Sequence, residues 1–496
     1  MVFSQSNFDL DSKLPFWGGF FIVLIAFATR FFQLDSQLWL DEYSAIIQNF
    51  RRSTYDLIFT YPGSASHLLY ELLGHWSSTL FGESSFSIRL PAALFGVAGV
   101  GMAGLIAARI VNSMTGLLVA GLMAVSYHHI FFSQNARGYT LLIFLFLWLT
   151  YLFMRLAHTR VLDIKQGGLY AFVTVLTCYS QPFGVFVPAG HFIVACGLAL
   201  MGHRNQDDVK FPFKAYFIWM SVAAIFTILL YAPLVAGMLE HAAMNASTSE
   251  EGPRFGIDLL IEVIEGLRAA FFGYVGLAIA TIAGSAGALI WIKRDAMSFF
   301  VVMAPFVLQA LVFTGLGFGI HPRYFAIAIP IIYLAGGMVI YLVFDWVFSR
   351  FFEKGAVRTA MNGSLIVFLM LLTSVPLIRY YQVPKQDFQG AMHFVEDSID
   401  EHGLRIGVQS VGSIMSTYYN LDYTRIDSYE ELLTAEQKGQ RVWVVMTLER
   451  IMSVADPKLV DHIHNQYTLL KQFPGTVGDG SIQVYRQNTI TAQTLE

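Results

Sequence analysis

Residues 90–110 read LPAALFGVAGVGMAGLIAARI, an apolar run in which Arg109 is the only charged residue. A hydrocarbon core is crossed by about 20 helical residues at a rise of 1.5 Å each, so this run predicts a membrane-spanning helix. Residues 168–201 are long enough for two short spans that meet near Gln181, Pro182 and Gly184. Similar single runs occur at residues 16–32, 114–132, 139–157, 215–238, 269–292, 297–318, 324–348 and 360–378. The sequence therefore predicts a polytopic α-helical membrane protein with about eleven transmembrane helices.

The composition of the chain supports this class. Hydrophobic residues make up 55% and charged residues 13% of the 496 positions, against roughly 45–50% and about 25% in a soluble domain. A mean hydropathy of +0.55 also excludes a disordered chain. A net charge of −4 leaves no basic surplus for nucleic acid, which is not expected as a partner. Cys178 and Cys196 lie inside apolar runs and are expected to be core residues, not a disulfide or a zinc site.

Basic residues in the connections predict the orientation, because cytoplasmic loops are enriched in Lys and Arg. With the N-terminus in the cytoplasm, the basic connections at residues 155–165, 204–214, 293–294 and 350–358 all face the cytoplasm. No small-residue cleavage site follows the first apolar run, so it is interpreted as an anchored span and not as a signal peptide. The exoplasmic side then receives residues 34–89, 239–268, 133–138 and 317–323 and the tail after residue 379.

Two exoplasmic segments are expected to fold. Apolar residues recur at helical spacing within residues 39–50 and 68–76, which predicts interfacial helices in the first loop; simple packing on the bundle is the alternative for either helix. Strand-like runs at residues 405–408, 441–446, 467–473 and 481–485 alternate with helical patterns around residues 388–399 and 429–437. They predict a small soluble α/β domain over residues 380–496, with a mainly parallel sheet and an antiparallel edge after the turn at residues 478–480. The membrane domain would occupy residues 1–379, and the tail would serve packing, capping or acceptor recognition.

Asp41 and Glu42 are the first candidates for chemistry. Adjacent acids often occur by chance, and a solvated or helix-capping role is the alternative interpretation. This pair, however, lies at the mouth of the predicted bundle among Trp39, Leu40 and Tyr43. Partial loss of solvent there would raise the proton affinity of a carboxylate, as a general base working near neutral pH requires.

Arg89, Arg137 and Arg323 each lie at the exoplasmic end of a predicted span. A single arginine in such a place usually extends to the lipid headgroups. Three of them on the same face as the acid pair indicate anion binding instead, and a guanidinium group can bind two phosphate oxygens at once. These residues suggest a phosphate-linked, membrane-borne substrate beside a carboxylate base. His128 and His129 are interpreted as ordinary interfacial histidines.

The ordered set of motifs resembles the GT-C glycosyltransferases of the family 39 and lipid A aminoarabinose transferase type, which includes the protein O-mannosyltransferases. The commoner His-Pro-Pro-Leu form of that family is replaced here by Ser-His-Leu-Leu at residues 66–69. The matching elements are Asp41-Glu42, His67 to Tyr70, the Arg-Leu-Pro-Ala entry that starts at Arg89, the turn with Ser133, Gln134, Arg137 and Tyr139, and Arg323-Tyr324.

This resemblance implies an inverting glycosyltransferase of the bacterial inner membrane. It would move a sugar from a polyprenyl-phosphate donor to a lipid, glycan or protein acceptor on the periplasmic side, where the tail domain would also lie. Asp41 would be the general base, Glu42 would position the base, the acceptor or a cation, and Arg137 and Arg323 would bind the donor phosphate. The further substrate-binding candidates are His67, Tyr70, Arg89, Gln134, Tyr139 and Tyr324.

Two points stay open in the sequence. Glu42 and His67 are candidate ligands for a divalent cation, but two ligands are too few to predict a metal site. A transporter or flippase of polyprenyl-linked sugars is the alternative function. Transporters, however, place charged residues and broken helices near the bilayer midplane and often contain inverted repeats, and the sequence indicates neither.

Overall fold

The structure is a computed structural model that describes residues 15–63, 66–204, 210–247, 256–268, 270–316, 321–353, 355–399, 403–478 and 480–488. Parts of the predicted connections at 204–214, 239–268, 317–323 and 350–358, and of the turn at 478–480, lie outside these residues. The chain forms two compact units. The first comprises Met1–Leu34, Ser53–Gly82 and Ser87–Leu377, and the second comprises Asp35–Arg52, Glu83–Phe86 and Ile378–Glu496. The unit of the tail therefore includes part of the first loop.

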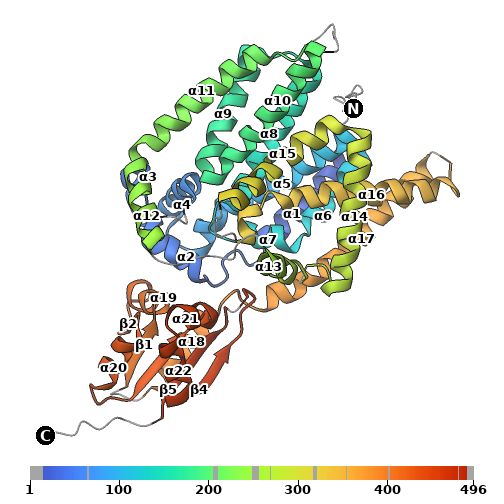
Figure 1. Cartoon of the computed structure of the whole chain (residues 1–496). Helices are drawn as coiled ribbons and strands as arrows, with labels where there is room; N and C mark the ends of the chain where they lie inside the picture. Colours follow the sequence, from blue (N-terminus) through green and yellow to red (C-terminus); the bar gives the residue numbers. More distant parts are fainter. Residues whose placement is uncertain are drawn as a thin grey trace. The chain divides into compact units, whose positions relative to one another are not determined.

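Each of the ten apolar runs contains at least one helix, and residues 168–201 contain two, which confirms the predicted polytopic class (Figure 1). In the part of the chain that the structure describes, eight helical segments are long and apolar enough to cross a membrane. The pair α6–α7, bent by 62°, makes a ninth if it is one span, and α1 is apolar but shorter. The helices are α1 (Phe16–Phe31), α5 (Ser85–Ile110), α6 (Ser113–Ala124), α7 (Tyr127–Ser133), α8 (Tyr139–Thr159), α9 (Ile164–Ser180), α10 (Phe186–Arg204), α11 (Phe213–Tyr231), α14 (Gly273–Arg294), α15 (Ala296–Leu316), α16 (Ala328–Ser349) and α17 (Ala356–Gln382).

Residues 168–201 form two helices that meet where the sequence predicts a break. Helix α9 ends at Ser180, Gln181 is extended, and a 3-10 turn over Pro182–Val185 leads into α10. A Cβ on Gly184 would lie 1.9 Å from the carbonyl oxygen of Thr177, so only glycine fits where the turn folds back on α9. Shorter helices of the first unit are α3 (Thr54–Phe59), α4 (Leu68–Phe81), α12 (Val235–Ser247) and α13 (Ile257–Arg268).

A buried arginine stabilises the bend between α6 and α7. Arg30 of α1 is fully buried, and its guanidinium donates to the carbonyl of Ala124 at 2.9 Å and lies 2.7 Å from Nδ1 of His129. A cation suits this position because the last carbonyls of α6 have no partner within the helix. His129, expected at the interface, is instead fully buried beside Arg30. His128 contacts the carbonyl of Gly266 at 2.9 Å.

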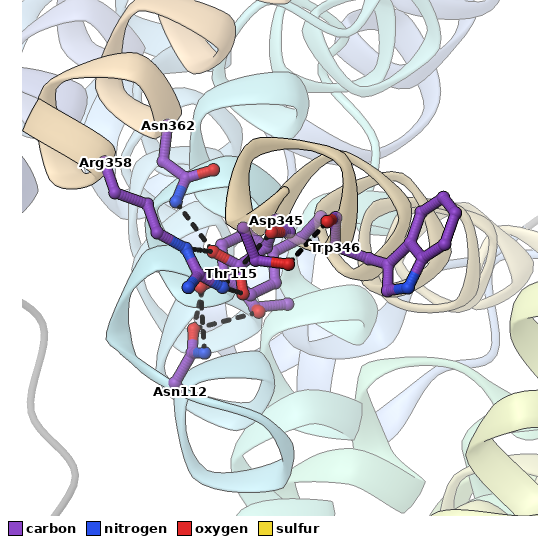
Figure 2. Close-up of polar contacts among 8 residues, drawn as sticks. Asn112, Thr115, Asp345, Trp346, Arg358 and Asn362 are labelled. Atoms are coloured by element: carbon purple, nitrogen blue, oxygen red, sulfur yellow. Dashed lines mark hydrogen bonds and ion pairs between the residues drawn. The ribbon is translucent and has the colours of Figure 1, made fainter. Parts of the chain in front are cut away.

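A polar cluster joins α16 to α17 and contacts the start of α6 (Figure 2). Arg358 donates to both carboxylate oxygens of Asp345, at 2.8 and 2.5 Å, and Asn362 donates to the same carboxylate at 3.0 Å. Asn112, which caps α6, donates to the hydroxyl of Tyr341 at 3.1 Å. The cluster closes the α16–α17 hairpin at the end of α16 that is remote from Arg323.

The tail forms a five-stranded sheet in the order β2-β1-β3-β5-β4, coloured orange to red in Figure 1. Strand β1 pairs in parallel with β2 and β3, and β5 is antiparallel to β3 and β4. Four strands thus run in one direction and β5 is reversed, which agrees with the predicted mainly parallel sheet. The antiparallel strand after the turn at residues 478–480 was predicted at an edge, but β5 lies between β3 and β4, and β4 forms the edge. The strands are β1 (Leu404–Val408), β2 (Thr424–Ile426), β3 (Val442–Met446), β4 (Tyr467–Phe473) and β5 (Ile482–Gln487).

The helices of this domain pack on the sheet through apolar residues. Ile406 and Val444 of the sheet belong to one buried core with Leu432, Leu459 and Ile463 of the helices. The sequence did not indicate β2, whose three residues are too short for a clear alternation, or the helices α21 and α22. The helices are α18 (Phe388–Ser398), α19 (Ser410–Ser413), α20 (Tyr429–Glu436), α21 (Glu449–Ala455) and α22 (Pro457–Gln466).

Candidate functional site

His67, immediately before α4, is the point at which several predicted site residues of the first unit meet. Its side chain is buried, and its ring packs edge-on against Tyr139 with 4.8 Å between ring centroids. Burial, together with the positive charges of Arg137 and Arg323, lowers the pKa of His67 well below its usual value. Its Nδ1 atom is buried and has no hydrogen-bond partner among the residues that the structure describes. The result is a neutral imidazole close to two guanidinium groups.

Gly138 allows the turn that carries Arg137 to pack directly on this segment. A Cβ at Gly138 would lie 3.0 Å from Nδ1 of His67 and 3.1 Å from Cβ of Tyr70. The close approach is therefore to the His67 segment itself. Because Arg137 and Tyr139 are the neighbours of Gly138, this contact sets the distance of both from the imidazole.

Arg323 lies in a turn that is held in place by the next residue, Tyr324. The side chain of Arg323 is exposed, on the 3-10 turn Pro322–Phe325. The ring of Tyr324 packs against Phe183 at 4.9 Å, and its carbonyl accepts a hydrogen bond of 2.9 Å from Gln309 of α15. The turn is thus attached both to the break between α9 and α10 and to α15.

Two further predicted site residues bond to backbone near the start of α5. Tyr70 donates to the carbonyl of Ile88 at 2.7 Å, and Arg89 donates to the carbonyl of Leu34 at 3.0 Å. Both side chains are buried. These contacts give Tyr70 and Arg89 a structural function, whatever else they do.

Gln134 likewise holds backbone. Its amide nitrogen donates to the carbonyls of Arg30 and Phe32, at 3.1 and 2.7 Å, where α1 ends. Because the last carbonyls of a helix have no partner within it, Gln134 satisfies two such groups at once. The turn between α7 and α8 is therefore attached to the end of α1, and this attachment places Arg137.

Glu71 is a buried acid that the sequence analysis did not identify. It lies in the first turn of α4, and its Oε1 accepts a 2.9 Å hydrogen bond from the backbone N–H of His67. Burial and the charge of Glu71 raise the pKa of Tyr61. The signal in the sequence is an acid four residues after His67 at a helix start, where a carboxylate interacts favourably with free N–H groups.

The two acids of the predicted catalytic pair have different environments within the second unit. They lie on α2 (Leu40–Ala45), which continues as a π-helical turn over Ile46–Phe50. Glu42 is fully buried, and its Oε2 accepts a hydrogen bond of 3.3 Å from the backbone N–H of Trp39. Asp41 is half-buried. Glu42 therefore caps its own helix, and Asp41 is the acid of the pair that keeps contact with the surroundings.

Metal ligands and thiols add no further site. In the described segments, no group of three or more His, Cys, Asp or Glu residues is arranged to hold a metal ion, and the divalent cation stays a prediction. Cys178 is buried, Cys196 is half-buried, and both are free thiols.

The fold is similar to that of known membrane glycosyltransferases. ArnT from Cupriavidus metallidurans matches in its apo state with a TM-score of 0.55 and 12% identity, over 94% of this chain and 97% of ArnT. ArnT bound to undecaprenyl phosphate matches with a TM-score of 0.52 and 11% identity, over the same shares. The archaeal oligosaccharyltransferase AglB from Archaeoglobus fulgidus, in complex with an inhibitory peptide and a dolichol-phosphate, matches with a TM-score of 0.52 and 12% identity, over 95% of this chain and 74% of AglB.

No protein-family model and no curated protein sequence matches the chain. At 11–12% identity the likeness establishes the fold, and it confirms the predicted GT-C-like architecture of membrane helices followed by a small sheet domain.

Proposed function

We propose that the protein is a polyprenyl-phosphate-dependent glycosyltransferase of the GT-C type. The observation that carries the proposal is the buried His67, whose unpartnered Nδ1 lies in the field of Arg137 and Arg323. Two guanidinium groups and a neutral imidazole offer hydrogen-bond donors to a phosphate. The fold supports it, because ArnT has been seen with undecaprenyl phosphate and AglB with a dolichol-phosphate.

The proposed reaction is an inverting transfer. Asp41 takes the proton from a hydroxyl group of the acceptor, whose oxygen then attacks the anomeric carbon of the sugar. The bond from that carbon to the phosphate oxygen breaks, and its electron pair leaves with the polyprenyl phosphate. Arg137 and Arg323 stabilise the charge that grows on this phosphate, the usual contribution of preorganised cations. Glu42 holds the helix that carries the base. The reaction would take place on the periplasmic side of a bacterial inner membrane.

Transfer in proteoliposomes tests the base. Mass spectrometry of lipid that co-purifies with the protein identifies the donor, which is then supplied in labelled form. Asp41→Asn should reduce transfer by about 10²–10⁴-fold, because the amide keeps the size of the side chain but cannot accept the proton. Binding of undecaprenyl phosphate should be unchanged. Asp35→Asn, at an exposed position six residues earlier, is the matched control and should transfer at the parent rate.

Two outcomes would contradict the proposal. Transfer by Asp41→Asn near the parent rate would remove Asp41 as the base. Movement of the labelled lipid across the liposome bilayer without any transfer of sugar would favour the transporter or flippase.

A further inference from the structure

The C-terminal domain binds the first turn of the helix that carries the acid pair. The backbone N–H of Leu40, the first residue of α2, donates to Oε1 of Gln386 at 2.8 Å. The amide nitrogen of Gln386 donates to Oγ1 of Thr447 at 3.1 Å, and Thr447 in turn donates to the carbonyl of Ser481 at 3.1 Å. Thr447 follows β3 and Ser481 precedes β5, so this series of hydrogen bonds runs from α2 to the centre of the sheet.

The same domain also surrounds the residue that follows the acid pair. Tyr43 is 1% exposed, and its ring packs edge-on against Tyr418 and Phe388, at 4.8 and 5.2 Å between centroids. Its hydroxyl and that of Tyr419 are 2.5 Å apart and share a hydrogen bond. Phe388 is the first residue of α18 and is itself fully buried. Tyr43 is therefore part of the hydrophobic interior of this unit.

These contacts matter because α2 cannot hold its own conformation. Even with the π-helical turn over Ile46–Phe50 that continues it, the segment is shorter than the about 12–15 residues that an isolated helix needs, since nucleation costs more than so few hydrogen bonds return. Leu40 and Tyr43 are bound to the domain immediately before and after Asp41 and Glu42. With the backbone held on both sides, the position of the Asp41 carboxylate is set by the domain.

We propose that Gln386 and Tyr419 are positioning residues for Asp41, and that the C-terminal domain serves catalysis by holding the acid pair. The proposal rests on the proposed function for the role of Asp41. It assigns to the domain a task in the reaction that does not require contact with either substrate.

A spin label next to α2 measures this support directly. Gln48 is exposed in the turn that follows α2, and a nitroxide at Gln48→Cys reports the mobility of the segment. The label is placed in the full chain with Cys178→Ala and Cys196→Ala, and its spectrum is compared with and without Gln386→Leu or Tyr419→Phe. Each variant removes one hydrogen bond to the segment and keeps a side chain of similar size.

Tyr467→Phe is the matched control. It removes a buried phenol hydrogen bond of the same domain, the 2.7 Å contact of Tyr467 with Glu436, which lies outside the residues that touch α2. We expect both test variants to raise the mobility of the label and to lower kcat for transfer about tenfold, since small misplacements of a catalytic group are costly. Their affinity for undecaprenyl phosphate should be unchanged. Tyr467→Phe should leave the spectrum and kcat at parent values.

Unchanged mobility in both test variants would overturn the proposal, and so would raised mobility with parent kcat. An equal loss of kcat in Tyr467→Phe would also overturn it, because the effect would then follow from general loosening of the domain. The spectrum does not depend on turnover. If Asp41→Asn kept full transfer, the proposed base would fail, and the label would still report whether Gln386 and Tyr419 hold α2.

Discussion

Replacing Gly138 by alanine tests whether direct packing of the turn on His67 builds the candidate phosphate site. The added Cβ would lie 3.0 Å from Nδ1 and 3.2 Å from Cβ of His67, and 3.1 Å from Cβ of Tyr70. These distances are shorter than the 3.5–4.0 Å that is optimal between carbon atoms. The backbone of Gly138, at φ −76° and ψ 16°, accepts any residue, so the cost arises from the contact alone.

The neighbours cannot move away freely. Tyr70 is held by its 2.7 Å hydrogen bond to Ile88, and the ring of Tyr139 packs against the imidazole of His67. Overpacking of this kind costs about 1–3 kcal/mol, and we expect Gly138→Ala to lower the free energy of unfolding by this amount. If the displaced imidazole and Arg137 lose about 1.4 kcal/mol of interaction with phosphate, the affinity for undecaprenyl phosphate falls about tenfold.

Gly101→Ala is the matched control, because a Cβ there meets nothing within 4 Å. It lies inside α5, where alanine should stabilise the helix by about 0.5–1 kcal/mol. Stability in detergent and binding of undecaprenyl phosphate are measured on both variants. If Gly138→Ala matched Gly101→Ala in both measurements, the packing of the turn on His67 would not set the site.

The remaining predictions concern charges. Arg137→Ala should bind undecaprenyl phosphate about ten- to a hundredfold more weakly. Arg137→Lys should recover only part of this affinity, because lysine lacks the planar guanidinium group that binds two phosphate oxygens at once. Unchanged affinity together with lower stability would mean that Arg137 has a structural role. The folded-state pKa of His67 lies below that of the unfolded chain, so the unfolded state binds more protons in acid. Stability is therefore complete above about pH 6.5 and falls as the pH decreases, by up to about 1.4 kcal/mol per pH unit. His67→Gln should remove this loss of stability in acid from melting curves recorded between pH 7.5 and 5. An identical pH dependence in both proteins would contradict the lowered pKa of His67. Asp345→Asn removes the charge that binds Arg358 and should lower the melting temperature in detergent without changing the affinity for undecaprenyl phosphate; a change in affinity would show that the cluster reaches the site.

The spans could be predicted because their signal is local. An apolar run of sufficient length must form a helix in a membrane, where every backbone N–H and C=O needs a partner within the protein. The same local chemistry predicted the break at Gln181 and Pro182, where proline follows an extended residue. The strands β1, β3, β4 and β5 were predictable as short apolar runs between polar turns.

The candidate site was only partly predictable. Its residue types followed from motifs, and the charges of Arg137 and Arg323 both lower the pKa of His67. The sequence did not indicate that Glu71 holds the backbone of His67, or that Tyr70, Arg89 and Gln134 bond to carbonyl groups. Which partner a polar side chain takes depends on what the fold places beside it, and periodicity carries no such information.

The sequence by itself determined the class of the protein, the positions of its apolar helices and four of the five strands of its last domain, because hydrophobic length and alternation are properties of neighbouring residues. Only the tertiary structure decided that the acid pair belongs to the unit of the C-terminal domain. The contact that shows it joins Leu40 to Gln386, 346 positions apart. Arg30 meets the end of α6 across 94 positions. Such pairs form only when the chain folds, because the free energy gained by burying them must exceed the entropy lost in bringing distant segments together. No local pattern in the sequence therefore predicts them.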